Sequence, residues 1–253
     1  MLEKNKLFEE AEKAIEWIRN YVEKIGAKGV VVGNSGGKDS ATVIGMATKA
    51  LGKDKVVTVA MPCNSIQTDL EDAKLVAQKF EVPFVEVNLT STYNEFENTI
   101  NKSLSNIELN KDSKINMKPR LRMTTLYAIA QTLGYLVIGT GNLCETMVGY
   151  TTKWGDSASD FNPIANFTVD EVLSIGEYLG VPDKIIHKAP NDGLGGQTDE
   201  EKMGVTYKQI AEYIETGRTE SKAMENIEKR NKSSKHKREP IPVYNFERKK
   251  YLD

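Results

Sequence analysis

The chain has 253 residues, and its 34 lysine and arginine residues nearly balance its 36 aspartate and glutamate residues, for a net charge of −2. That balance gives no case for a nucleic-acid-binding protein, and no apolar run approaches the roughly 20 residues that a membrane-spanning helix needs. The two cysteines, Cys63 and Cys144, form neither a disulfide framework nor a metal-ligand spacing, and we expect both to be buried apolar groups. No signal peptide is visible, and the two isolated cysteines fit a reducing setting, so we expect a cytoplasmic protein. From the charge balance and the lack of a long apolar run we expect it to bind neither nucleic acid nor a membrane.

The first half of the chain alternates predicted strands with predicted helices. Apolar spacing predicts a packing helix over residues 3–25, and short apolar runs predict strands over residues 29–33, 55–61 and 83–89. Helices are predicted between these strands, over residues 41–51 and about 69–80. This alternation indicates an α/β fold with a parallel twisted sheet and helices on both faces. Ligands bind beyond the carboxyl ends of such strands, so we expect the loop after the first strand to be functional.

The second half is more polar and more helical. We expect a helix ending near Leu104, a loop at 110–114, a helix over about 119–132 with Pro119 in its first turn, and a strand over 135–140. Residues 141–167 and 190–197 are predicted to be functional loops that contain no helix or strand. Helices are expected from Thr168, as N-cap, to Gly180, and near 206–216 and 219–231. We therefore expect one domain over residues 1–253, with a helical C-terminal extension.

The loop after the first strand has the composition of an anion-binding site. Its sequence is Ser35-Gly36-Gly37-Lys38-Asp39-Ser40, and a strand, a glycine turn and a helix in this order expose backbone N–H groups to a phosphate. It is not a Walker loop, because Asp39 follows Lys38, and not a dinucleotide fingerprint, because Ser35 replaces the second glycine. A Gly-Gly pair alone would be compatible with a plain turn. A carboxylate among phosphates, however, indicates a bridging divalent cation.

Two later stretches carry further candidates. The stretch Gly139-Thr140-Gly141-Asn142-Leu143-Cys144-Glu145 follows a predicted strand, so Glu145 could share a cation with Asp39, and Thr140 could bind a nucleotide. Residues 149–160 combine a lysine, aromatic residues and two carboxylates. Arg120 and Arg122 lie two apart on a predicted helix, so that only one of them can readily face a given site.

Together these stretches resemble the ammonia-dependent NAD synthetases, within the pyrophosphate-loop ATP pyrophosphatases. The resemblance extends through residues 116–123, 160–164, 196–200 and 236–238, and so covers nearly the whole chain in order. It implies an adenine nucleotide α-hydrolase-like fold. It also implies a ligase that amidates nicotinic acid adenine dinucleotide (deamido-NAD) with ammonia and ATP, giving NAD, AMP and pyrophosphate through an adenylated intermediate.

The resemblance also implies roles for individual residues. The residues that would bind ATP are Gly33, Asn34, Ser35, Gly36, Gly37, Lys38, Asp39, Ser40, Thr140 and Asn191. The residues that would bind deamido-NAD are Arg120, Lys153, Asp160, His236 and Lys237. Asp39 and Glu145 would hold Mg²⁺, and Asp160 would receive or orient ammonia, with Asp39 and Lys153 as the other catalytic residues. The family also implies a homodimer with the dinucleotide site at its interface.

Some positions depart from the family pattern. Val169 stands where the family commonly has a lysine that contacts ATP phosphates, so that Lys38 or Lys188 would have to substitute. The second loop has Asn191, which can still donate a hydrogen bond, and Asp192, which adds a negative charge. Two alternatives therefore stay open. One is another pyrophosphate-loop enzyme, such as one that modifies tRNA, against which the net charge and the isolated cysteines argue. The other is a nucleotide-binding protein without catalysis.

The nitrogen source is expected to be ammonia. A chain of 253 residues is too short to hold a glutaminase domain beside the synthetase motifs. A separate glutaminase could still supply the ammonia.

Overall fold

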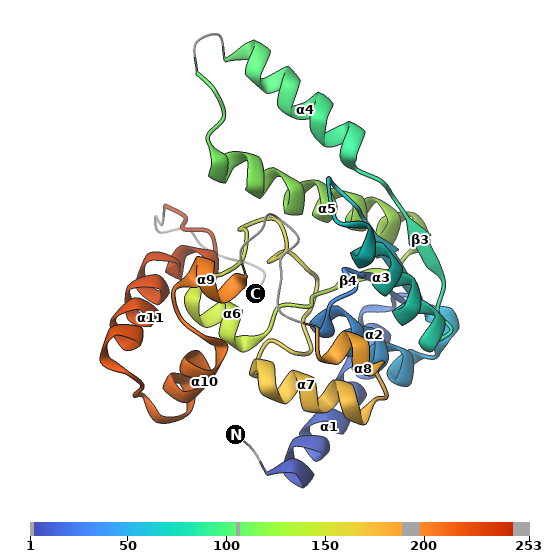
Figure 1. Cartoon of the computed structure of the whole chain (residues 1–253). Helices are drawn as coiled ribbons and strands as arrows, with labels where there is room; N and C mark the ends of the chain where they lie inside the picture. The colour runs from blue at the N-terminus through green and yellow to red at the C-terminus, as the bar shows by residue number, and fades with distance from the viewer. Residues whose placement is uncertain (1–2, 105–106, 189–197, 245–253) are drawn as a thin grey trace.

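The computed structural model describes residues 3–104, 107–188 and 198–244 (Figure 1). The strands are β1 (Val30–Gly33), β2 (Val56–Ala60), β3 (Phe84–Glu86) and β4 (Leu136–Ile138). The helices are α1 (Lys4–Ile25), α2 (Lys38–Leu51), α3 (Gln67–Lys79), α4 (Thr90–Ser103), α5 (Lys111–Leu133), α6 (Leu143–Val148), α7 (Val169–Tyr178), α8 (Asp183–Ile186), α9 (Asp199–Met203), α10 (Tyr207–Thr216) and α11 (Ser221–Ser233). Two 3₁₀ turns, η1 (Lys53–Lys55) and η2 (Lys235–Lys237), complete the described elements. None of the described helices is long and apolar enough to cross a membrane.

The four strands form one parallel sheet in the order β3-β2-β1-β4. Val30 of β1 lies opposite Val56 of β2 on one side and Leu136 of β4 on the other. The predicted parallel α/β fold is therefore confirmed. Because β1 is an inner strand, the loops after β1 and β4 leave the same edge of the sheet side by side.

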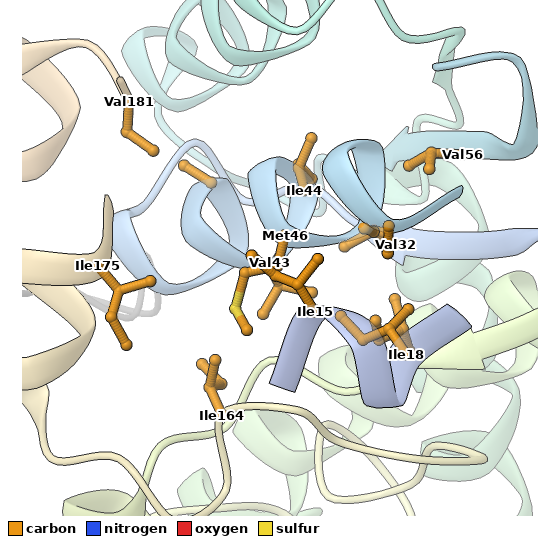
Figure 2. Close-up of a cluster of buried hydrophobic side chains, with 14 of the residues drawn as sticks. Ile15, Ile18, Val32, Val43, Ile44, Met46, Val56, Ile164, Ile175 and Val181 are labelled. Atoms are coloured by element: carbon orange, nitrogen blue, oxygen red, sulfur yellow. The ribbon is translucent and has the colours of Figure 1, made fainter. Parts of the chain in front are cut away.

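Helices cover both faces of the sheet, as predicted. Val30 and Val32 of β1 belong to a buried cluster with α1, α2 and α7, and Figure 2 shows Ile15, Met46 and Ile175 of these helices within it. Val31, which points to the opposite face, packs with residues of α5 such as Ala130. Each fully buried aliphatic side chain stabilises the fold by roughly 1.5–3 kcal/mol, so these two clusters fix the position of β1.

A third buried cluster lies beside the sheet, where α6 packs against α10 and α11 (Figure 1). Its residues include Cys144 of α6, Val169 of α7 and Ile227 of α11. The helical C-terminal extension is therefore present, and it is held by the segment that follows β4. Cys63 and Cys144 are both free and buried, as expected.

One predicted helix boundary was wrong. Helix α5 begins at Lys111 instead of Pro119, which lies inside the helix and is buried. The side chain of Asn110 accepts a hydrogen bond from the backbone N–H of Ser113 at 2.8 Å, which caps the earlier start. Proline removes one internal hydrogen bond of a helix, but capping and packing of the first turns keep this helix continuous.

The expectation of a loop without elements over residues 141–167 was also wrong, because helix α6 lies within it. This helix has only 6 residues, too few for a periodic pattern. Asn142 and Glu145 form a capping box at its start: the Asn142 side chain accepts the Glu145 backbone N–H, and the Glu145 carboxylate accepts the Asn142 N–H. The pair therefore fixes α6 directly after β4.

Candidate active site

The loop between β1 and α2, residues 34–37, is shaped by its own side chains. The buried side chain of Asn34 donates a hydrogen bond to the Ala73 carbonyl oxygen at 2.8 Å and accepts one from the Gly36 N–H at 3.1 Å. Ser35 and Ser40 share a hydrogen bond between their hydroxyl oxygens at 3.1 Å. The loop is thus held in one shape with protein contacts alone.

Gly36 is required at its position for two reasons. Its φ is +72°, and a Cβ there would lie 2.5 Å from the Asp69 carbonyl oxygen. The loop therefore packs against the start of α3, and the N-terminus of the 14-residue helix α2 follows it directly. A helix N-terminus after a glycine loop favours a bound anion through its free N–H groups and its dipole.

The structure brings Asp39 and Glu145 together, as the sequence predicted. The side-chain amide of Asn142 donates a hydrogen bond to Asp39 Oδ1 at 3.1 Å, and Asn142 is also the residue that caps α6 with Glu145. Asp39 is on α2 and Glu145 on α6, so the two carboxylates come from the segments that follow the adjacent strands β1 and β4. Asn142, which is 1% exposed, joins them.

The surroundings of Glu145 destabilise the charged form of its carboxylate. Burial raises its pKa well above the usual value, and the negative charge of Asp39 raises it further. No group of three or more possible metal-binding side chains exists among the described residues. Two carboxylates fit Mg²⁺ nevertheless, because this ion is usually held by one or two protein carboxylates together with water and substrate phosphates.

Three of the predicted dinucleotide-binding residues lie in one chain of contacts. Arg120 of α5 donates a hydrogen bond from Nε to the Lys153 carbonyl oxygen at 3.3 Å, and Lys153 donates one from Nζ to the His236 carbonyl oxygen at 2.7 Å. Arg122 turns away, as expected, and donates from Nε to the Met61 carbonyl oxygen at 3.1 Å. The segment around Lys153 is thus held between α5 and η2.

Lys237 acts on the same segment from the other side. Its ammonium donates hydrogen bonds to the carbonyl oxygens of Gly149 and Thr151, at 2.8 and 2.6 Å. Burial lowers its pKa. Lys237 therefore fixes the backbone of residues 149–151. The sequence analysis did not predict these two hydrogen bonds.

Asp160 lies beside β4. Its Oδ2 accepts a hydrogen bond from the Val137 N–H at 2.7 Å, and its Oδ1 accepts one from the Tyr127 hydroxyl at 3.2 Å. Burial raises the pKa of Tyr127 to about 12, with a further contribution from the charge of Asp160, so the hydroxyl remains a donor. No described contact joins Asp160 to Asp39 or to Lys153. Asp160 is an exposed residue, but these two hydrogen bonds hold its carboxylate in a defined orientation.

The remaining predicted residues fall in different places. Thr140 lies just beyond the end of β4, on the same side as Asp39. Lys188 is bound to Asp69 and Asp72 of α3, at 2.8 and 2.7 Å, and Val169 is buried in the C-terminal cluster. Asn191 and Asp192 lie outside the described residues.

Comparison with known proteins gives the family. The family model described as NAD synthase matches residues 10–241. The chain belongs to the NAD synthase family. It is 43% identical over 231 residues to an NH(3)-dependent NAD(+) synthetase from Carboxydothermus hydrogenoformans, covering 91% of this chain and 94% of the relative. It is 45% identical over 203 residues to one from Thermococcus sibiricus, covering 80% and 78%.

Solved structures agree with this membership. The structure of an NMN synthetase from Francisella tularensis superposes with a TM-score of 0.88 at 35% identity, covering 95% of this chain and 99% of that one. An NH3-dependent NAD synthetase from Campylobacter jejuni superposes with a TM-score of 0.79 at 25% identity, covering 97% and 100%. The expectation of an amide-forming ligase with this fold is therefore confirmed, and the comparisons give no support to the tRNA-modifying or the non-catalytic alternative. The roles of single residues stay predictions.

Proposed function

We propose that the chain amidates deamido-NAD with ammonia, using ATP and forming an adenylated intermediate. The observation that carries the proposal is the joining of Asp39 and Glu145 by Asn142, directly beside the glycine loop. This arrangement presents an anion-binding loop and two carboxylates at the carboxyl ends of β1 and β4, where ligands of parallel sheets bind.

In the first step a carboxylate oxygen of the substrate attacks the α-phosphorus of ATP. The bond from that phosphorus to the bridging oxygen breaks, and pyrophosphate leaves with the electron pair. Both reactants are anions, so catalysis depends on positioning them and neutralising their charge. The N–H groups at the start of α2 would hold the phosphates, and Mg²⁺, if held by Asp39 and Glu145, would screen the negative charge.

In the second step ammonia attacks the carbonyl carbon of the adenylate, AMP leaves, and one proton is lost from nitrogen. We propose that the Asp160 carboxylate orients the ammonia molecule and accepts the proton that the nitrogen loses. Its orientation is already set by Val137 and Tyr127. Arg120, Lys153 and His236, which form one chain of contacts, are the proposed binding residues for the dinucleotide.

We also propose that the enzyme is a homodimer through the hairpin of α4 and α5. Figure 1 shows α4 and the first half of α5 projecting from the rest of the molecule. Helix α4 buries only Tyr93, whereas Phe96 is 46% exposed and Ile107, just beyond the helix, is 67% exposed. Apolar side chains on a projecting hairpin fit a second copy of the same surface. Sedimentation tests this: Phe96→Lys should yield monomers, and Trp17→Lys, outside the hairpin, should not.

One observation favours a second substrate. The neighbour from Francisella tularensis is an NMN synthetase, and its TM-score and identity exceed those of the NAD synthetase from Campylobacter jejuni. Amidation of nicotinic acid mononucleotide is therefore the second candidate. Steady-state assays with ATP, Mg²⁺ and ammonium decide between them. A higher kcat/KM for deamido-NAD supports our proposal, and a higher value for the mononucleotide overturns it in favour of the second.

A further inference from the structure

Asp199 is a buried carboxylate of the C-terminal extension that the proposed mechanism does not use. It is the first residue of α9 and is 7% exposed. Its Oδ1 accepts a hydrogen bond from the Tyr150 hydroxyl at 3.1 Å, and its Oδ2 accepts a longer one from the Tyr207 hydroxyl at 3.4 Å. A carboxylate out of water is stable only when donors satisfy its oxygens, so Asp199 and the Tyr150 hydroxyl hold each other in place.

Tyr150 lies in the segment that leads from α6 to Lys153. Its backbone N–H donates a hydrogen bond to the Glu145 carbonyl oxygen at 2.9 Å. The residues on either side of it are the two whose carbonyl oxygens accept hydrogen bonds from Lys237. Lys237 and Glu145 therefore hold the backbone of this segment, and Asp199 holds the side chain in the middle of it.

The surroundings of Asp199 make its carboxylate a fixed point. Burial raises the pKa of the Tyr207 hydroxyl, and the charges of Glu145 and Asp199 raise it further, so this hydroxyl remains a donor at neutral pH. Tyr207 belongs to the buried cluster of α6, α10 and α11, and its backbone N–H donates a hydrogen bond to Glu200 Oε1 at 2.8 Å. The anchor of Tyr150 is thus tied to the packed interior of the extension.

The same extension contains a second bond between a tyrosine hydroxyl and a carboxylate. The Tyr213 hydroxyl donates a hydrogen bond to Glu228 Oε1 at 3.1 Å, which joins α10 to α11. The bond between Tyr150 and Asp199 has the same length but joins the extension to the segment before Lys153. The place of this bond in the fold, and not its geometry, points to a role in the site.

We propose that Asp199 is a positioning residue for the dinucleotide substrate, acting through the Tyr150 hydroxyl to fix the segment that carries Lys153. The inference rests on the proposed function, which gives Lys153 a part in binding deamido-NAD. Lys153 lies three residues after Tyr150, so releasing the Tyr150 side chain loosens the position of the Lys153 ammonium. The substrate must then order this segment when it binds, which weakens its affinity.

The first measurement follows the segment without any substrate. The chain has two tryptophans, Trp17 and Trp154, so Trp17→Phe leaves Trp154 as the only fluorescent reporter of this type. Trp154 is 53% exposed, and the Lys153 ammonium lies 5.5 Å from the centre of its ring. In the full-length Trp17→Phe protein, Tyr150→Phe and Asp199→Ala should each raise the amplitude of the nanosecond depolarisation of Trp154 fluorescence about twofold.

The second measurement is steady-state kinetics with deamido-NAD and ATP varied in turn. Tyr150→Phe and Asp199→Ala should each raise the KM for deamido-NAD about tenfold and leave the KM for ATP unchanged. The two effects should not add in the double variant, because both substitutions remove the same bond. Tyr150→Phe keeps the ring and removes only the hydroxyl, so it carries the test even where Asp199→Ala does not fold.

Tyr213→Phe is the matched control, because it removes a bond of the same kind and length in the same extension. It should change neither the depolarisation of Trp154 nor either KM. Unchanged depolarisation of Trp154 in folded Tyr150→Phe would overturn the proposal, whatever the activity of the parent protein. Altered depolarisation with an unchanged KM for deamido-NAD would also overturn it, because Asp199 would then stabilise only the fold.

The two measurements also separate this inference from the proposed function. A parent protein that forms no NAD, with Trp154 still released in Tyr150→Phe, would refute the proposed function. The same result would support the hold of Asp199 on the segment.

Discussion

The side-chain amide of Asn142 donates a hydrogen bond to the carboxylate of Asp39 at 3.1 Å, although the two residues are 103 positions apart. The same Asn142 side chain caps α6 by accepting the backbone N–H of Glu145. One neutral, buried residue therefore sets the distance between two carboxylates that would otherwise repel each other. It ties the arrangement of these two proposed metal-binding carboxylates to the stability of a helix of six residues.

Asn142→Ala should affect both the fold and the response to metal. Loss of the N-cap costs about 1 kcal/mol of unfolding free energy, and Asp39 loses a donor that orients it. We expect a higher Mg²⁺ concentration for half-maximal activity, measured by metal titration beside urea unfolding. Asn110→Ala, which removes the N-cap of α5, is the matched control and should lower stability by a similar amount with the metal response unchanged. Equal metal responses in the two variants would show that Asn142 has a capping role only.

Gly36→Ala should inactivate the enzyme through the shape of the loop. The backbone has φ +72°, and the new Cβ would lie 2.5 Å from the Asp69 carbonyl oxygen and 2.9 Å from the Ala73 backbone nitrogen. A positive φ alone costs roughly 1–2 kcal/mol in a residue with a Cβ, and the close contacts add to it. Gly26→Ala has nearly the same φ, +74°, with no atom within 4 Å, and should lose stability but keep activity. Activity retained in Gly36→Ala would contradict this account.

Lys237→Met should weaken binding of the dinucleotide more than binding of ATP. The substitution removes two hydrogen bonds that fix the carbonyl oxygens of Gly149 and Thr151, just before Lys153. Losing about 1.4 kcal/mol of positioning corresponds to a tenfold rise in the KM for deamido-NAD. Steady-state kinetics with each substrate varied in turn measure the effect. Lys235 is an exposed neighbour that pairs with Glu239, so Lys235→Met should change neither the KM for deamido-NAD nor the KM for ATP. An equal rise of both KM values in Lys237→Met would argue against a specific role for Lys237 in binding the dinucleotide.

The contact between α3 and α8 predicts a dependence of stability on pH. Burial acts to raise the pKa of Asp72, but the ammonium groups of Lys184 and Lys188 outweigh it, so the pKa is lowered. A carboxyl group with a lowered folded-state pKa stabilises the protein above its unfolded-state pKa of about 3.9, and this contribution is lost as the pH falls through the folded-state value.

Asp72→Asn should therefore lower the unfolding free energy at pH 7 by about 2 kcal/mol, the scale of hydrogen bonds to a charged group. The difference from the parent protein should shrink as the pH falls below about 5. Urea unfolding between pH 7 and pH 3 measures this. Glu81→Gln removes an exposed pair with Lys53 and serves as the control. A difference that stays constant with pH would show that the charge of Asp72 is not what stabilises the contact.

Local patterns were enough to predict the centre of the fold. Apolar runs define the strands around Val31 and Val59, and a parallel sheet brings the segments after β1 and β4 together, so that Asp39 and Glu145 could be paired from the sequence. The glycine loop could be predicted from the sequence because close backbone packing at Gly36 requires this residue type.

The contacts between distant segments could not be predicted in the same way. Nothing in the sequence near Asn142 indicates that its amide reaches Asp39, and Lys237 is one of many lysines in a basic tail. Pro119 normally favours a helix start, and only packing and the Asn110 cap show why α5 begins earlier. Such features depend on tertiary packing, which local propensity does not contain.

The most direct test of the account follows one oxygen atom. The enzyme is incubated with ATP, Mg²⁺, ammonium and deamido-NAD labelled with ¹⁸O in its pyridine carboxylate, and the products are analysed by mass spectrometry. Attack of the carboxylate on the α-phosphorus predicts NAD, AMP carrying one ¹⁸O, and unlabelled pyrophosphate, with all three lost in Asp39→Asn. Label in pyrophosphate or phosphate, or NAD formed without labelled AMP, would contradict adenylation at this site.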